Sequence, residues 1–423
     1  MKSNRLISPV VVGLLGILFF FIVYVFAPIS PKVHLHTHTI LYVLISYVMF
    51  FLGCLFLYLI PTKKQKNKGF RTTHEDLEGQ FRLSIFLAVV GISFRLIDRF
   101  YLRNISLFQS AFENRELLEQ ADSGLLSIFG GLIYPICFLV LFLFLKNNGK
   151  IFSFAGFAIL ILFLFPTFDS FLFGSRSLIL VNVMMLLLIL RGTGRLKVRF
   201  IQVLCLSFLL VLLIGLSGYM FLSRLDEMGL DVFDTIYISG YATTVGPSDW
   251  VASQLSEGLT VINTLLFSWL NFTQYYTHGL FEFNNFLGMA VDKHSYGATQ
   301  FNVIYKLAAK IFPLPGLDIV LNGVNPRPGV FTTFFGPAHM DFGYFSPIFL
   351  FILGAFSAKV HRHITLSDSY YSILYYMLVI IVFFMPVVSF IQSAQGLYII
   401  FSIIFYSIVY KTFCKLPKFR LIK

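Results

Sequence analysis

The sequence predicts an all-α integral membrane protein with about ten transmembrane helices. Of its 423 residues, 57% are hydrophobic and 12% are charged, and the mean hydropathy is +0.81. Soluble domains carry about 25% charged residues, so the charge available here is too small to cover a soluble globule. The composition therefore excludes a cytosolic enzyme, a disordered chain and a disulfide-stabilised scaffold.

Apolar segments of membrane-spanning length recur along the chain. A hydrocarbon core about 30 Å thick needs roughly 20 apolar residues per helix. We predict ten spans, at 7–27, 39–60, 81–101, 124–145, 151–168, 172–190, 200–222, 343–360, 369–390 and 394–411. The first lacks a small-residue cleavage site, so we expect a transmembrane helix there rather than a removable signal peptide.

These spans divide the chain into three regions. They are 1–222 with about seven spans, 223–342 as one large extracytoplasmic loop, and 343–423 with about three spans and a basic cytoplasmic tail. Apolar stretches of the loop, too short or too interrupted to span, lie at 259–270, 280–290 and 300–312. A loop of this length is rarely structureless, and we expect amphipathic helices at the outer membrane face.

The charge distribution predicts the orientation. The net charge is +12, from 32 Lys and Arg against 20 Asp and Glu. With the N-terminus in the cytoplasm, every predicted cytoplasmic loop is basic, and about two-thirds of the basic residues are cytoplasmic, as the positive-inside rule requires. Both termini are then cytoplasmic. The basic excess indicates topology, which removes the support for nucleic-acid binding.

A minority of arginines lie at the predicted outer face or inside spans. A guanidinium binds phosphate through two parallel hydrogen bonds and stays charged when buried, so these arginines are candidates for binding a pyrophosphate. The candidates are Arg95, Arg99, Arg176, Arg224 and Arg327. The alternatives are an ion pair with Asp98 for the first two, lipid headgroup contacts for the next two, and an exposed loop position for the last.

Two acid–base clusters accompany the arginines. His278 and Glu282 are four residues apart, so on a helix they share a face and can hydrogen-bond, which suits a base oriented by a carboxylate. His339 and Asp341 precede the eighth span. The alternatives are an interfacial aromatic belt around His278, and Asp341 as the N-cap of the next helix. Neither cluster has metal-ligand spacing, and no metal or other cofactor is expected.

Three short segments carry a family resemblance. They are Gly174-Ser175-Arg176, Tyr276-Thr277-His278-Gly279 with Glu282-Phe283, and Phe331-Thr332-Thr333 with Gly336 and Asp341-Phe342-Gly343. Together with the layout of most of the chain, they resemble the Wzy-type oligosaccharide repeat-unit polymerases of O-antigen and capsule synthesis. The Arg-x10-Gly pattern of some members is absent, because Leu187, Thr235 and Ala338 stand at the glycine positions.

The resemblance implies a GT-C-type glycosyltransferase, inverting and metal-independent, in the inner membrane of a bacterium. At the outer face it would transfer the growing glycan from one undecaprenyl pyrophosphate to a new lipid-linked repeat unit. Implied partners are undecaprenyl-pyrophosphate-linked oligosaccharides and membrane lipids, with a chain-length regulator and a flippase as further candidates. An O-antigen ligase or another lipid-carrier-dependent transferase is the alternative, followed by a polysaccharide flippase.

Overall fold

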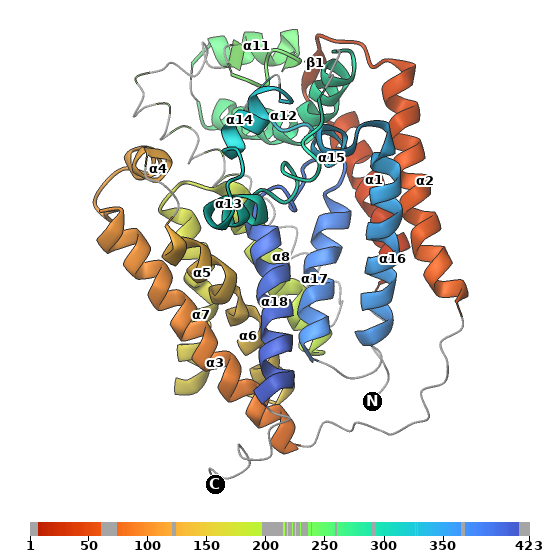
Figure 1. The fold of residues 1–423 in the computed structure, drawn as a ribbon. Coiled ribbons are helices and arrows are strands. Elements are labelled where there is room, and N and C mark those ends of the chain that lie inside the picture. Colours follow the sequence, from red (N-terminus) through yellow and green to blue (C-terminus); the bar gives the residue numbers. More distant parts are fainter. Residues whose placement is uncertain are drawn as a thin grey trace.

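A computed structural model gives the fold of most of the chain (Figure 1). It describes residues 7–60, 74–120, 124–196, 239–258, 260–289, 293–325, 327, 329–364 and 369–413, with residues 215, 218, 222, 225, 229, 236 and 237. These residues are mostly helical. The predicted class of all-α membrane protein is confirmed by the long apolar helices, whereas a GT-C relationship stays a prediction.

Apolar helices form the membrane part. They are α1 (Pro9–Val25), α2 (Thr37–Leu59), α3 (His74–Leu96), α5 (Leu125–Ile133) with α6 (Cys137–Lys146), α7 (Phe154–Phe171), α8 (Arg176–Gly192), α16 (Ser346–Ile364), α17 (Ser369–Phe383) and α18 (Ala394–Phe413). Short helical turns extend three of these elements: the π-helix η1 (Ile97–Leu102), and the 3-10 turns η2 (Tyr134–Ile136) and η3 (Gly343–Phe345).

Six helical stretches among the described residues are long and apolar enough to cross a membrane. They are Thr37–Leu59, Asp76–Leu102, Leu125–Lys146, Phe154–Phe171, Phe335–Ile364 and Gln395–Phe413. Shorter apolar helices occupy the predicted first, sixth and ninth spans, at Pro9–Val25, Ser177–Gly192 and Ser369–Phe383. The predicted span 200–222 lies mostly outside the described residues, so the count of ten stays a prediction.

Successive apolar helices run in alternate directions. At the lower end in Figure 1, Arg362 Nη2 donates to the Tyr58 carbonyl at 2.7 Å, and Lys146 Nζ donates to Ser369 Oγ at 3.0 Å. At the upper end, Asn284 Oδ1 accepts a hydrogen bond of 2.8 Å from the backbone at the start of α2. These contacts place the end of α2 beside the end of α16, and the end of α6 beside the start of α17.

Basic side chains gather at the lower end. Lys146, Arg191, Arg362 and Lys411 lie in the last turns of α6, α8, α16 and α18. The start of α1 and the end of α18 lie at this end too (Figure 1). The charge asymmetry read from the sequence therefore falls on one end of the helix bundle. That this end faces the cytoplasm stays a prediction.

The segment predicted as the outer loop forms the upper end of the molecule (Figure 1). It contains α11 (Asp249–Ser256), α12 (Val261–Leu287), α13 (Asn302–Ile311), α14 (Leu317–Asn322) and α15 (Phe335–Phe342). Strand β2 (Val245–Pro247) pairs antiparallel with β1 (Ile29–Pro31), which follows α1. The helix α4 (Ala111–Gln120) stands beside this region. The apolar stretch predicted at 300–312 corresponds to α13.

The apolar stretches predicted at 259–270 and 280–290 lie on one helix, α12, which spans Val261–Leu287. Polar residues between the two stretches continue this helix. They are buried and bond within it: Thr273 Oγ1 donates to the Trp269 carbonyl at 2.9 Å, and Thr277 Oγ1 to the Thr273 carbonyl at 2.7 Å. A helix interior satisfies threonine hydroxyls in this way without interruption.

Close backbone contact joins α2 to α16. Glycines stand where the two backbones come closest: a Cβ atom on Gly53 would overlap the Phe351 carbonyl oxygen, and one on Gly354 would overlap the Phe50 carbonyl oxygen. Small residues let membrane helices approach so that van der Waals contact, rather than hydrophobic burial, holds them together. The two glycines therefore fix how α16, which follows the candidate site, is docked on α2.

We expect Gly53→Ala to destabilise the protein by about 1–3 kcal/mol, because overpacking pushes α16 away from α2. Gly79→Ala is the matched control, since Gly79 is in a helix and has no atom within 4 Å of its added Cβ. It should stabilise the helix by up to about 1 kcal/mol. Thermal unfolding of the detergent-solubilised variants measures both. Equal shifts in the two variants would contradict the proposed packing.

Candidate functional site

The candidate site is built on α12, which places His278 and Glu282 one helical turn apart. Its N-cap is Thr260, whose hydroxyl accepts from the Asn263 amide at 3.1 Å, and the helix ends at Gly288. His278 is 0% exposed and Glu282 is 2% exposed. A carboxylate this deeply buried requires a partner of opposite charge.

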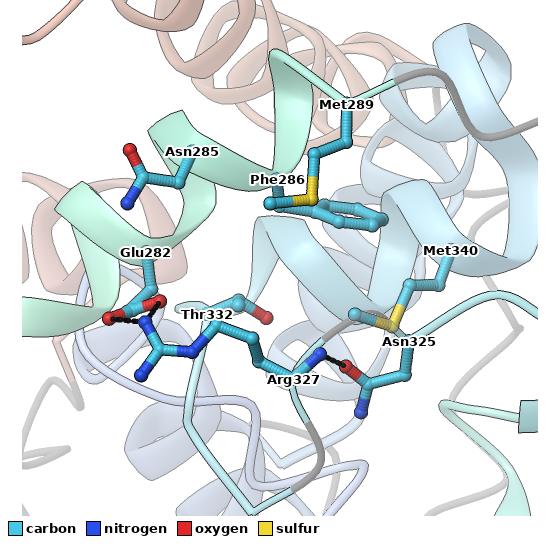
Figure 2. A pocket seen from close by; sticks show the side chains of 8 residues that line it. All are labelled: Glu282, Asn285, Phe286, Met289, Asn325, Arg327, Thr332 and Met340. Atoms are coloured by element: carbon cyan, nitrogen blue, oxygen red, sulfur yellow. Dashed lines mark hydrogen bonds and ion pairs between the residues drawn. The ribbon is translucent and has the colours of Figure 1, made fainter. Parts of the chain in front are cut away.

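Arg327 is that partner. Its Nη1 lies 2.8 Å from both Glu282 carboxylate oxygens (Figure 2). Thr244 Oγ1 donates to Oε1 at 3.1 Å. The Arg327 side chain is 34% exposed, so one end of the pair is buried and the other reaches the surface. The alternative of a plain exposed loop arginine is therefore wrong.

Arg327 also binds the turn that precedes β2. Nη1 donates to Thr243 Oγ1 at 3.0 Å, and Nη2 lies 3.5 Å from the Gly240 carbonyl oxygen. Its backbone N–H donates to Asn325 Oδ1 at 3.2 Å. One guanidinium thus joins α12, the turn at 239–244 and the segment that leads to α15.

His278 is bonded at one ring nitrogen. Nδ1 lies 2.8 Å from the Gln274 carbonyl oxygen. Because a carbonyl only accepts, Nδ1 carries the hydrogen and Nε2 carries the free lone pair. Among the described residues, no hydrogen-bond partner reaches Nε2. The predicted His278–Glu282 hydrogen bond is wrong, because the backbone takes Nδ1 and Arg327 takes the carboxylate.

Aromatic rings enclose His278. The ring of Tyr241 is centred 4.3 Å from it, that of Tyr275 6.2 Å and that of Phe331 6.5 Å. This burial lowers the pKa of His278 to about 4, and the nearby positive charge of Arg327 adds to the effect. His278 is therefore neutral at pH 7 and able to accept a proton at Nε2. The rings are partly buried, and His278 beneath them is fully buried.

A small hollow lies beside the ion pair. Its walls are Glu282, Asn285, Phe286, Met289, Asn325, Arg327, Thr332 and Met340 (Figure 2). The enclosed part has room for about one water molecule. A sugar or a phosphate therefore enters only when the surrounding side chains move.

The Asp341 carboxylate accepts hydrogen bonds from three neighbouring residues. Its Oδ1 accepts from Ser295 Oγ at 2.6 Å and from the Thr299 amide at 2.9 Å, and Oδ2 accepts from the Gln300 amide at 2.8 Å. The alternative role of Asp341, as the N-cap of the following helix, is wrong, since it lies in the last turn of α15 and accepts from the amides at 299–300. The geometry favours this role over that of a base.

His339 packs against Phe286, one of the residues that line the hollow beside the ion pair. Its Nδ1 is 3.2 Å from Tyr42 Oη, and its ring is centred 6.3 Å from that of His294 and 5.6 Å from that of Phe286. No group of three His, Cys, Asp or Glu side chains within the described ranges has the arrangement of a metal site. His339 and Asp341 therefore have different partners, and the predicted pairing of the two is not part of the site around His278 and Glu282.

Arg95 and Arg99 meet at Asp169, near the end of α7. Arg95 Nη2 lies 3.1 Å from Asp169 Oδ2, and Arg99 Nε lies 3.1 Å from Oδ1. Asp98, the partner considered from the sequence, is 4.0 Å from Arg99 Nη1 and binds Arg103 Nε at 3.2 Å instead. All five side chains are buried.

Asp169 was missed because it falls between two predicted spans. An acidic residue at the end of an apolar run was the available signal.

The remaining predicted arginines lie elsewhere. Arg176 is the first residue of α8, after Gly174 with φ +57° and the N-cap Ser175. Arg224 lies outside the described residues. The structure therefore brings together His278, Glu282 and Arg327, and keeps Arg95 and Arg99 in a separate network. Sequence reasoning also missed Thr243 and Thr244, whose contacts depend on the fold.

Comparison of the chain with protein-family models, with curated proteins and with solved structures gives no match. The proposed function therefore depends on the geometry described above and on the resemblance of the sequence motifs.

Acid is expected to destabilise the folded protein through His278. The unfolded chain takes up this proton near pH 6.5, whereas the folded chain takes it up only near pH 4, so stability falls as the pH drops from 6.5 to 4. The loss approaches about 3 kcal/mol.

Thermal unfolding across this range measures the effect. His278→Asn, which retains a donor for the Gln274 carbonyl, should flatten the pH dependence, and His34→Asn at an exposed position should leave it unchanged. An unchanged slope in the first variant would contradict the pKa assigned to His278.

Asp169→Asn is expected to cost about 3–5 kcal/mol, because it leaves Arg95 and Arg99 buried without their shared carboxylate. Glu78→Gln is the control, since Glu78 forms an exposed pair with Arg82 and should change stability by less than about 0.5 kcal/mol. Unfolding in detergent and yield in the membrane fraction measure both variants. Equal mild effects would mean that the arginine network does not stabilise the fold.

Proposed function

We propose that the protein polymerises oligosaccharide repeat units carried on undecaprenyl pyrophosphate, as an inverting, metal-independent glycosyltransferase of GT-C type. One observation supports the proposal. Glu282 pairs with Arg327, a residue of the type that binds phosphate, one helical turn from the buried neutral His278, at the end of the bundle opposite the basic helix ends. The resemblance of the motifs around His278 and Glu282 to the Wzy-type polymerases supports it.

The proposed reaction assigns a role to each side chain. The acceptor hydroxyl attacks the anomeric carbon of the donor glycan, and its proton passes to His278 Nε2. The bond from the anomeric carbon to the pyrophosphate oxygen breaks, and its electron pair leaves with the lipid pyrophosphate. Arg327 stabilises the charge that develops there, as a fixed cation does without reorganisation.

Arg176 and Arg224 are proposed as further contacts to the pyrophosphate. Arg176 suits this role because it begins α8 at the end of the bundle where α12 lies, and a helix N-terminus favours anions. Arg95 and Arg99 suit it less, since Asp169 already binds both guanidinium groups. We propose that they hold α3 against α7, in a network separate from His278 and Glu282.

The proposed location follows from the same roles. Lipid-linked repeat units reach such a site laterally from the outer leaflet of the bacterial inner membrane, with both termini of the chain in the cytoplasm. Exposed apolar side chains at the upper end of α1, such as Val25 and Phe26, at 71% and 69% exposed, suit contact with the hydrocarbon region.

Purified protein supplied with lipid-linked repeat units is expected to form a ladder of polymers on a gel, with or without chelator. His278→Ala should lower the rate about 10²–10⁴-fold through loss of the base. Arg176→Ala should abolish elongation and Arg176→Lys should restore part of it, because lysine cannot form the bidentate contact.

Arg82→Ala is the control for this assay, because Arg82 is exposed and lies in the first half of α3, which begins at the lower end of the bundle in Figure 1. A normal ladder from the His278 and Arg176 variants would refute the proposed site. Loss of activity with chelator would refute the metal-free reaction. Transfer of finished polymer to another acceptor, without a ladder, would indicate a ligase.

A further inference from the structure

In this conformation, the burial of His278 conflicts with its proposed role as a base. Its Nε2 lone pair has no partner among the described residues, yet the side chain is 0% exposed. A buried acceptor without a hydrogen bond costs about 1–3 kcal/mol. A base that receives a proton from a hydroxyl must also be reached by that hydroxyl. The conformation is therefore closed, and something must open it.

Two of the three rings around His278 stand on segments outside α12. Tyr241, with its ring 4.3 Å away, belongs to the turn at 239–244. Phe331, at 6.5 Å, belongs to the segment between Arg327 and α15. Tyr275 is the third and lies on α12 itself. Opening therefore requires movement of the turn, of the segment, or of both.

Arg327 ties both segments to α12. Through Nη1 it binds Glu282 at 2.8 Å and Thr243 Oγ1 at 3.0 Å, so the turn carrying Tyr241 is held down. Arg327 is itself part of the chain that leads, four residues later, to Phe331. The contacts of this one guanidinium thus hold both Tyr241 and Phe331 against His278.

Arg327 is also the part of this arrangement that an outside ligand reaches first. Its side chain is 34% exposed, against 2% for Glu282, and it lines the hollow together with Asn325 and Thr332. A phosphate oxygen at this point meets a guanidinium and polar groups, and its geometry suits bidentate binding by arginine. A hydroxyl without charge has no comparable means of displacing Glu282.

We infer that the Arg327–Glu282 ion pair is a latch over His278, and that a phosphate-class anion opens it by taking Arg327 from Glu282. Once released, the turn with Tyr241 and the segment with Phe331 move apart and uncover Nε2. Glu282 keeps the hydrogen bond from Thr244 Oγ1 when Arg327 leaves. Resting on the proposed function, the anion is the lipid pyrophosphate of the donor, and the acceptor hydroxyl reaches His278 only after the donor is bound.

Chemical labelling of His278 tests the latch without any turnover. The full chain in detergent is treated with diethylpyrocarbonate, and mass spectrometry of peptides gives the rate of modification at each histidine. His34, His36 and His38 are exposed and serve as internal references. In the wild type we expect slow labelling of His278, and about tenfold faster labelling with inorganic pyrophosphate. Sodium chloride at matched ionic strength should not change the rate, which separates bidentate binding from screening.

Variants separate the latch from a general loosening of the fold. Arg327→Ala alone leaves Glu282 buried and unpaired and is prone to misfold. The double variant Glu282→Gln, Arg327→Gln removes both charges, and should label His278 about tenfold faster without pyrophosphate and show no response to it. Glu78→Gln, Arg82→Gln removes a matched pair four residues apart on α3 and should behave as the wild type.

Three outcomes would overturn the latch: fast labelling of His278 in the untreated wild type, no effect of pyrophosphate, or a monodisperse double variant that labels as slowly as the wild type. These outcomes do not depend on catalysis. A latch that opens in a protein that forms no polymer refutes the proposed function alone. Polymer formation with His278 labelling unaffected by pyrophosphate refutes the latch alone.

Discussion

The arrangement of the upper end depends on the need to neutralise one buried carboxylate. Glu282 is on a helix face that packs into the protein, and water does not solvate it there. Arg327 supplies the opposite charge from a segment 45 residues away in the chain. Because a buried charge without a partner costs several kcal/mol, the pairing fixes where that segment runs. The positions of Tyr241 and Phe331 around His278 follow from it.

The same constraint operates around Asp169 with a different result. There, the carboxylate and its two arginines are all buried, and Asp98 with Arg103 completes the cluster. Exchange with an outside anion would expose several desolvated charges at once. The Glu282 pair has one partner that is a third exposed, so a single ion reaches it. An ion pair with both partners buried is suited to stabilising the fold. An ion pair with one partner partly exposed is suited to exchanging that partner for a ligand.

Sequence reasoning located the membrane helices because spanning a bilayer requires long apolar runs, a local property. It also found the shared face of His278 and Glu282, because helical spacing is local. It failed on the tertiary contacts. Packing brings Arg327 to Glu282 and Asp169 to Arg95 and Arg99. The Gln274 carbonyl competes for His278 Nδ1. The bonds from the turn at 299–300 to Asp341 were not foreseen either, because that turn folds back onto Asp341 only in three dimensions.

The neutral state of this site bears on how it would select a ligand. Arg327 and Glu282 cancel, and His278 is uncharged at pH 7, so the site exerts little long-range attraction on anions in general. Discrimination then depends on contact: a chloride ion offers one point charge, whereas a pyrophosphate offers several oxygens to the planar guanidinium and to the neighbouring amide of Asn325. Displacing a carboxylate held at 2.8 Å requires an anion that replaces both of its oxygens. An anion would therefore be selected by its ability to replace the Glu282 carboxylate on Arg327, and not by long-range attraction. Ordinary salts would leave His278 enclosed, and its lone pair would become accessible only when a phosphate-bearing substrate is bound.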